Sequence, residues 1–165
     1  MNHLQQHIFK TMLYYDIFSY PLKLEEIFTY LPCNSVHTDD VRNELSSLID
    51  EQLILEHQGY YFLRHRDRAI VDRRLNMELH AGRSWKIARF MTAIIKRFPF
   101  IRAVFVSGDL SINVSDDGSD IDFFVVTEHN RLWIARTLLV IFKKIVLLNR
   151  RKFFCNNYYL SETTL

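Results

Sequence analysis

Two carboxylates separated by one residue follow a glycine turn, and they are the residues of this chain best suited to chemistry. An apolar run ends at Ser107-Gly108-Asp109, and a second apolar run begins with Asp120-Ile121-Asp122. Side chains of a strand alternate between its two faces, so Asp120 and Asp122 are expected to point the same way. Neighbouring carboxylates repel each other unless a cation lies between them, and their oxygens suit a divalent metal such as Mg²⁺. The spacing predicts a metal-dependent site for phosphoryl or nucleotidyl transfer.

The acidic residues just before this triplet have a simpler interpretation. Asp116, Asp117 and Gly118 are of types that turns favour. We therefore interpret Asp116 and Asp117 as parts of a solvent-exposed turn between two strands. For Asp120 and Asp122, metal binding is the favoured interpretation, and the exposed turn is its alternative.

Charge is distributed unevenly along the chain, although the net charge is only +2. Residues 64–97 include ten Lys or Arg and three Asp or Glu. Residues 107–128 include six Asp or Glu and no Lys or Arg, whereas residues 131–152 include seven Lys or Arg and no acid. An acidic segment between two basic ones suits a metal site beside a surface that meets polyphosphate or nucleic acid. Two solvent-exposed basic helix faces would give the same pattern.

The second half of the chain alternates between strand-like and helical segments. We expect strands at residues 101–106, 120–127 and 153–160, with a glycine turn and a short helix after the first strand. A helix is expected at residues 132–149, between the second strand and the third. This alternation predicts a mixed α/β domain over residues 99–165.

The first 65 residues are expected to form three helices and a hairpin. After a helix at residues 3–18, apolar residues at Leu24, Ile27 and Leu31 have the spacing of an amphipathic helix. Thr38 is predicted to cap a third helix, and strand-like runs flank a turn at Gln58-Gly59. This order is that of a winged helix-turn-helix domain.

The third of these helices bears on DNA binding, because winged-helix domains often place it in the major groove. Its charges are mainly negative, from Asp39, Asp40, Glu44, Asp50 and Glu51. Phosphate contacts dominate affinity for DNA, so an acidic helix argues against direct DNA reading. A protein-interaction module, or a rigid arm for the second domain, is the favoured interpretation, and nucleic-acid binding stays open.

Residues 66–98 are predicted to be a helical connector. They contain no proline, and their second half has a regular apolar stripe that includes Ile87, Met91 and Ile94. Gly82 is predicted to break the segment into two helices, and Pro99 is predicted to end it.

Residues 101–160 resemble the nucleotidyltransferase superfamily of DNA polymerase β-like proteins. The shared pattern is a glycine and a serine, about ten residues, and an acid-apolar-acid triplet at the start of a strand. Here ten residues separate Gly108-Asp109 from Asp120-Ile121-Asp122. The combination with an N-terminal winged helix also resembles a group of uncharacterised bacterial proteins. The fold implied is mixed α+β, with the nucleotidyltransferase-like sheet in the C-terminal part.

This resemblance implies roles for individual residues. Asp120 and Asp122 would hold Mg²⁺ against the phosphates of a nucleoside triphosphate. The backbone around Gly108 would bind the triphosphate, with Ser107, Asp109 and Ser111 beside it. The implied reaction moves a nucleoside monophosphate from NTP, such as ATP, to an acceptor hydroxyl that the sequence does not identify.

Two departures from the family pattern lead to a second interpretation. Asp109 stands where the family usually has serine, so Ser107 or Ser111 would have to supply the hydroxyl. The family usually has a third acid on a later strand, whereas residues 153–160 contain no Asp or Glu. The chain's end at Leu165 indicates a truncated or minimal member. The alternative is a catalytically degenerate protein that serves as a nucleic-acid-binding regulator or as a protein-interaction module with a partner chain.

Cellular location is predicted from the cysteines and from the most apolar segment. Cys33 and Cys155 have no metal-ligand spacing and are typical of reduced thiols in an intracellular protein. The N-terminus has no long apolar run. Residues 132–148 contain Arg136, Lys143 and Lys144, and such charges argue against a membrane span. We therefore predict a cytoplasmic protein with no membrane partner.

Overall fold

The chain forms two compact units in a computed structural model that describes residues 1–33, 35–146 and 155–164. The first unit comprises residues 1–75 and the second unit comprises residues 76–165. Both units combine helices with a small sheet, so the predicted mixed α and β composition is confirmed. None of the helices in the described ranges has the length and apolarity needed to cross a membrane.

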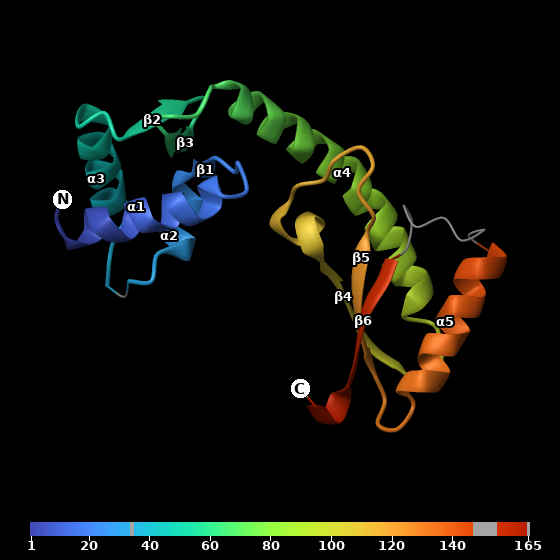
Figure 1. The fold of residues 1–165 in the computed structure, drawn as a ribbon. Helices are drawn as coiled ribbons and strands as arrows, with labels where there is room; N and C mark the ends of the chain where they lie inside the picture. Colours follow the sequence, from blue (N-terminus) through green and yellow to red (C-terminus); the bar gives the residue numbers. More distant parts are fainter. Residues whose placement is uncertain (34, 147–154, 165) are drawn as a thin grey trace. The chain divides into compact units, whose positions relative to one another are not determined.

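The first unit places three helices against a small antiparallel sheet (Figure 1). Its elements are α1 (His3–Asp16), β1 (Leu22–Lys23), α2 (Leu24–Tyr30), α3 (Thr38–Asp50), β2 (Ile54–His57) and β3 (Tyr60–Leu63). The strand order is β1-β3-β2. The core contains Ile8, Ile27, Val41 and Leu45 from the helices and Ile54 from β2, all nearly inaccessible to solvent.

Three local features of the first unit test the sequence interpretation. The tight turn at Gln58-Gly59 is present, and both residues have the positive φ that such hairpin turns require. The predicted N-cap at Thr38 is wrong by one residue, because His37 occupies this position and its N–H donates to Oδ2 of Asp40 at 2.9 Å. The strand β1 was not expected, and with two residues it is too short to show alternation.

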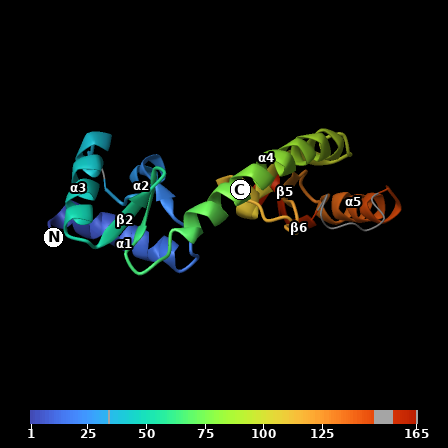
Figure 2. The ribbon, with the colours of Figure 1, turned by 90° about the horizontal axis from the view of Figure 1, so that it is seen from above.

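Helix α4 (Ala69–Ile95) is uninterrupted, as Figure 2 shows. The predicted break at Gly82 is therefore wrong. A glycine inside a helix costs only about 1 kcal/mol relative to alanine, and buried residues on either side of it, Ala81 and Ala88, hold the helix in the core. Its first turns belong to the first unit and its remaining turns to the second.

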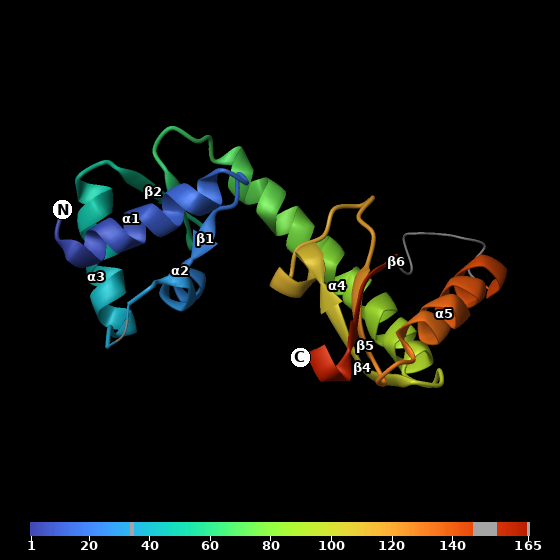
Figure 3. The same ribbon diagram turned by 60° about the horizontal axis from the view of Figure 1, so that its bottom comes forward.

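The second unit contains a three-stranded mixed sheet, whose strands lie side by side in Figure 3. Its further elements are β4 (Ile101–Ser107), the short 3-10 helix η1 (Gly108–Ile112), β5 (Asp122–Thr127), α5 (Leu132–Val146), β6 (Cys155–Ser161) and η3 (Glu162–Thr164). The order is β4-β5-β6, with β4 antiparallel and β6 parallel to β5. The predicted residues 147–149 of the helix and 153–154 of the last strand lie outside the described residues.

Helices α4 and α5 share one core with one face of this sheet. Phe123 and Val125 of β5 are inaccessible to solvent there, together with Leu139 of α5. Because side chains alternate along a strand, Asp122 and Phe124 point to the other face. That face also has the exposed ring of Phe105, whose centroid lies 6.0 Å from that of Phe124. The sheet thus keeps its carboxylate away from the core.

Candidate functional site

The glycine turn and the acidic triplet meet at the end of β4. Ser107, the last residue of β4, is paired with Asp122, the first residue of β5. Gly108 follows with a φ of +65°, and a Cβ atom placed on it would lie 2.7 Å from Oδ2 of Asp122. Glycine is therefore needed at this position for two reasons. The backbone is left-handed, and no side-chain atom fits beside the carboxylate of Asp122. The structure brings these two predicted site residues into contact distance.

The strand boundary corrects one detail of the prediction. β5 begins at Asp122, so Asp120 lies just before the strand and not within it. Asp120 is exposed, whereas Asp122 is partly buried. The argument from strand alternation therefore does not apply to Asp120, which lies outside the sheet.

Negative charge gathers around Asp122. Burial raises the pKa of this carboxyl above its usual range, and the nearby carboxylates of Asp120 and Asp109 raise it further. A hydrogen bond with Cys155 acts in the opposite direction and favours the charged form. The site therefore stores unfavourable electrostatic energy that a bound cation would relieve.

Cys155 is the site residue that the sequence interpretation missed. It begins β6 directly opposite Asp122 in the parallel pairing, and its N–H donates to the carbonyl of Ile121 at 2.8 Å. Burial, followed by the charge of Asp122, raises the pKa of its thiol. Only the strand register identifies this cysteine, because nothing in the local sequence distinguishes it.

The two serines of the motif are placed differently. The hydroxyl of Ser107 is buried and has no hydrogen-bond partner among the described residues. Ser111 is exposed, and its hydroxyl donates to the carbonyl of Gly108 at 2.6 Å. Ser111 therefore stabilises the turn itself, whereas the Ser107 hydroxyl keeps its hydrogen-bonding capacity.

The segment after η1 is a turn that docks on α4. Asp116 and Asp117 are exposed, and the N–H of Asp116 donates to the hydroxyl of Ser119 at 3.0 Å. The N–H of Ser115 donates to the carbonyl of Met77 at 3.1 Å, and this bond fastens the turn to the helix. The interpretation of Asp116 and Asp117 as residues of an exposed turn is confirmed.

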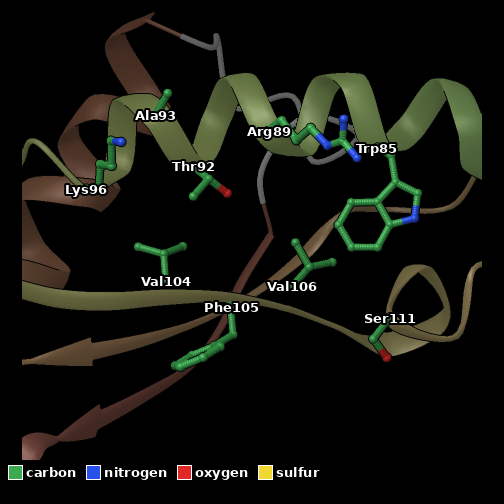
Figure 4. Close-up of a pocket in the computed structure, with 9 residues that line it drawn as sticks. All are labelled: Trp85, Arg89, Thr92, Ala93, Lys96, Val104, Phe105, Val106 and Ser111. Atoms are coloured by element: carbon green, nitrogen blue, oxygen red, sulfur yellow. The ribbon is translucent and has the colours of Figure 1, made fainter.

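A cavity of about 460 Å³ lies between α4 and β4. Figure 4 shows Val104 and Val106 pointing from β4 toward the helix, and Phe105 pointing away from it. The other lining residues are Trp85, Arg89, Thr92 and Ala93 of α4, Lys96 directly after it, and Ser111 of η1. The cavity does not include Asp120 or Asp122, but through Ser111 it adjoins the glycine turn. The sequence interpretation did not anticipate it, because the cavity forms only when α4 packs beside β4.

The donor set near Gly108 fits a hard divalent cation. Mg²⁺ is usually bound by one or two carboxylates, with substrate phosphates and water completing its coordination. Asp122 offers such oxygens beside Gly108, and Asp120 is close enough to raise the pKa of Asp122. Although Asp109 is close enough to raise the pKa of Asp122, no group of three or more metal-ligating side chains is present within the described ranges.

Comparisons with protein-family models, curated proteins and solved structures gave no match to this chain.

Proposed function

We propose that this chain is a Mg²⁺-dependent nucleotidyltransferase that moves a nucleoside monophosphate from NTP to an acceptor hydroxyl. The observation that supports the proposal most directly is the approach of Gly108 to Asp122. It joins the two halves of the motif, although many residues separate them in the sequence. A sheet with helices on one face and a carboxylate on the other agrees with the resemblance to the DNA polymerase β-like superfamily.

In this proposal each residue near the turn has a separate task. Asp120 and Asp122 would hold the Mg²⁺, which when bound offsets the negative charge of the departing pyrophosphate. Gly108 leaves room for phosphate oxygens to approach the backbone. The buried hydroxyl of Ser107 would donate to one of these oxygens. Asp109 is exposed, and its carboxylate would be compatible with a bound triphosphate only if a cation lies close by.

A second candidate is a nucleotide-binding protein without transferase activity, and Cys155 is the observation that favours it. The family's third acid serves the attacking hydroxyl, and here a cysteine is paired with Asp122 on the neighbouring strand. Because the pKa of its thiol is raised, Cys155 is protonated at neutral pH and cannot accept a proton from that hydroxyl. Such a protein would act as a regulator or as an interaction module.

The first unit supports a role in interaction under either candidate. Three helices and an antiparallel sheet with the order β1-β3-β2 agree with the proposed winged-helix domain. Its α3 begins with Asp39 and Asp40 in the first turn. We propose that this helix faces a protein partner, because phosphate groups would be repelled.

Isothermal titration with Mg²⁺ and each NTP tests the nucleotide site. We expect binding heat from the wild type that requires Mg²⁺, and loss of this heat in the Asp120→Asn, Asp122→Asn double variant. The matched control is Asp116→Asn, Asp117→Asn, which removes the same charge from the exposed turn and should bind as the wild type does. Equal binding by the two double variants, or no heat from the wild type, would contradict the proposal.

Release of pyrophosphate separates the two candidate functions. Wild-type protein that releases pyrophosphate from NTP, while the Asp120→Asn, Asp122→Asn variant does not, is a transferase. Binding without release in the presence of candidate acceptors favours the interaction module. The variant Cys155→Asp, which restores an acid beside Asp122, should then increase release if the missing acid is the cause.

A further inference from the structure

After Glu78, the exposed side of α4 has positive charge and no further acid. Residues 79–108 include six Lys or Arg and no Asp or Glu. Five of these cations lie on α4 or directly after it and are exposed: Arg83, Lys86, Arg89, Lys96 and Arg97. None of them forms an ion pair with a described residue. We call these five the basic face of α4. Like charges on one helix destabilise it, so the arrangement is not explained by helix stability.

Two of these cations are at the edge of the cavity between α4 and β4. Arg89 and Lys96 line it together with the hydroxyl-bearing Thr92 (Figure 4). They are seven residues apart, which corresponds to about 10 Å along a helix. The lining includes no carboxylate. A ligand with more than one negative charge along its length therefore fits this cavity, and a small single anion would meet only one of the two cations.

Aromatic side chains accompany the cations. Trp85 forms one wall of the cavity, and a hydrogen bond of 3.1 Å from its Nε1 to Oδ1 of Asn113 fixes the ring. Phe90 follows Arg89 on the helix and is 66% exposed. Exposed rings among cations are the combination that binds single-stranded nucleic acids, because cations attract phosphates and unpaired bases stack on aromatic rings.

The apolar side of α4 is already used inside the second unit. Ala81, Ala88, Met91 and Ile95 are buried in the core that α4 shares with the sheet. A helix that binds a membrane surface needs a broad free apolar face, and on the turns that carry the cations only Phe90 is a large exposed apolar residue. The chemistry of the surface thus favours a polyanion with bases over a lipid surface.

From these observations we infer that the basic face of α4 and the adjoining cavity bind single-stranded nucleic acid. Phosphates lie against Arg89 and Lys96, and an unstacked base lies against Phe90. The inference does not require nucleotidyl transfer, because it depends on α4 and not on the carboxylates. It also assigns nucleic-acid contact to a different element from α3, whose charge is unsuitable.

Fluorescence anisotropy with a labelled single-stranded oligouridylate tests the inference. We expect saturable binding by the wild-type chain that weakens as salt rises. The Arg89→Gln, Lys96→Gln double variant should bind about tenfold more weakly, and its salt dependence should be shallower by about 1.4, since each phosphate contact on a single strand contributes about 0.7. The matched control is Arg64→Gln, Lys144→Gln, which removes two exposed cations elsewhere and should change the dissociation constant less than about twofold.

A second variant separates stacking from charge. Phe90→Ala removes an exposed ring, so the fold should be retained, and circular dichroism checks this. We expect binding at least about fivefold weaker with an unchanged salt dependence, because stacking releases no counterions. The inference is overturned by absence of saturable binding at low salt, or by equal weakening in the two double charge variants. It is also overturned if Phe90→Ala binds as the wild type does.

Two further measurements distinguish this inference from lipid binding and from nucleotidyl transfer. Vesicles of phosphatidylcholine and phosphatidylserine should not bind; vesicle binding without oligouridylate binding would assign the basic face to a lipid surface instead. The Asp120→Asn, Asp122→Asn variant should keep its affinity for the oligonucleotide. If that variant loses only nucleotide binding, the two sites are independent and both proposals are supported. If neither the wild type nor the variant binds nucleotide but both bind the oligonucleotide, the transferase proposal is contradicted and this inference is retained.

Discussion

Residues 1–75 hold their partly buried charges in pairs of opposite sign. Arg74 donates to Oε1 of Glu26 at 2.7 Å, and its guanidinium lies 3.7 Å from the ring centroid of Tyr20. Arg66 makes a two-pronged contact with both carboxylate oxygens of Asp16, at 2.8 and 3.0 Å. In the second unit, charges of one sign are gathered instead: acids around Asp122 and cations along α4.

This difference separates charges that stabilise the fold from charges whose arrangement does not stabilise it. Opposite charges in contact use their hydrogen-bonding capacity on each other, so little of it remains for binding a ligand. Like charges held together raise the energy of the folded state, which a ligand of opposite sign lowers. The second unit also has ordinary ion pairs, from Arg102 to Glu128 and Glu162, but they lie away from the glycine turn, at the other end of the sheet.

Arg74→Met is expected to have the largest effect on stability. The Arg74 side chain is only 2% exposed, so its removal leaves the partly buried carboxylate of Glu26 without this partner. Breaking one side of such a pair costs about 3 kcal/mol. Urea unfolding followed by circular dichroism measures the loss, with Arg68→Met, at an exposed position, as the control. If Arg74→Met proves as stable as the control, the pair does not hold the first unit together.

Gly108→Ala should have an intermediate effect on stability, and it tests the contact between the glycine turn and the acidic triplet. The new Cβ would crowd Oδ2 of Asp122 in a left-handed backbone, and we expect a loss of about 1 to 2 kcal/mol in the free energy of unfolding. Mg²⁺-dependent nucleotide heat should disappear as well. Gly118→Ala is the control, because Gly118 has no atoms near its Cβ position and no positive φ. Equal results for the two glycines would show that the approach of Gly108 to Asp122 has no importance.

Asp122→Asn should have the smallest effect, of the opposite sign. The folded-state pKa of Asp122 is raised, so its ionisation opposes folding above the ordinary pKa of the carboxyl, and the full penalty is reached above the raised value. Without Mg²⁺ at neutral pH, Asp122→Asn should be more stable than the wild type, by about 0.5 kcal/mol. The gain should begin to shrink as the pH falls below the raised pKa, and it should vanish below the ordinary pKa of the carboxyl, where the unfolded wild type is protonated as well. Thermal unfolding at several pH values measures this difference, and a variant less stable than the wild type at neutral pH would contradict the crowding of charge.

Local patterns in the sequence were sufficient to predict most elements and their order. Apolar spacing predicted α2 and α3, and Gly59 between two strand-like runs predicted the hairpin turn at Gln58-Gly59. The same reasoning failed at Gly82, because the core contacts of Ala81 and Ala88 outweigh the weak helix propensity of one glycine. It also missed β1, whose two residues form a strand only through their pairing with β3.

The candidate site could be predicted only as far as it is local in sequence. The spacing of Gly108 and the acidic triplet indicated a shared site, and the structure places Gly108 against Asp122. Cys155 enters through the parallel register of β6, which no local pattern encodes. The cavity beside Arg89 needs the packing of α4 on the sheet. Contacts between distant segments thus account for what the sequence interpretation left out.

The parallel pairing of β6 has a consequence for the order in which the second unit folds. β4 and β5 follow each other closely in the chain, so their pairing closes a short loop and can form early. β6 joins only after the chain has passed through α5, and such non-local contacts form slowly. Because Cys155 lies on β6 and Asp122 on β5, the carboxylate acquires its thiol neighbour in the last step of sheet assembly. A newly made chain therefore has the glycine turn beside its acid before Cys155 is paired with Asp122.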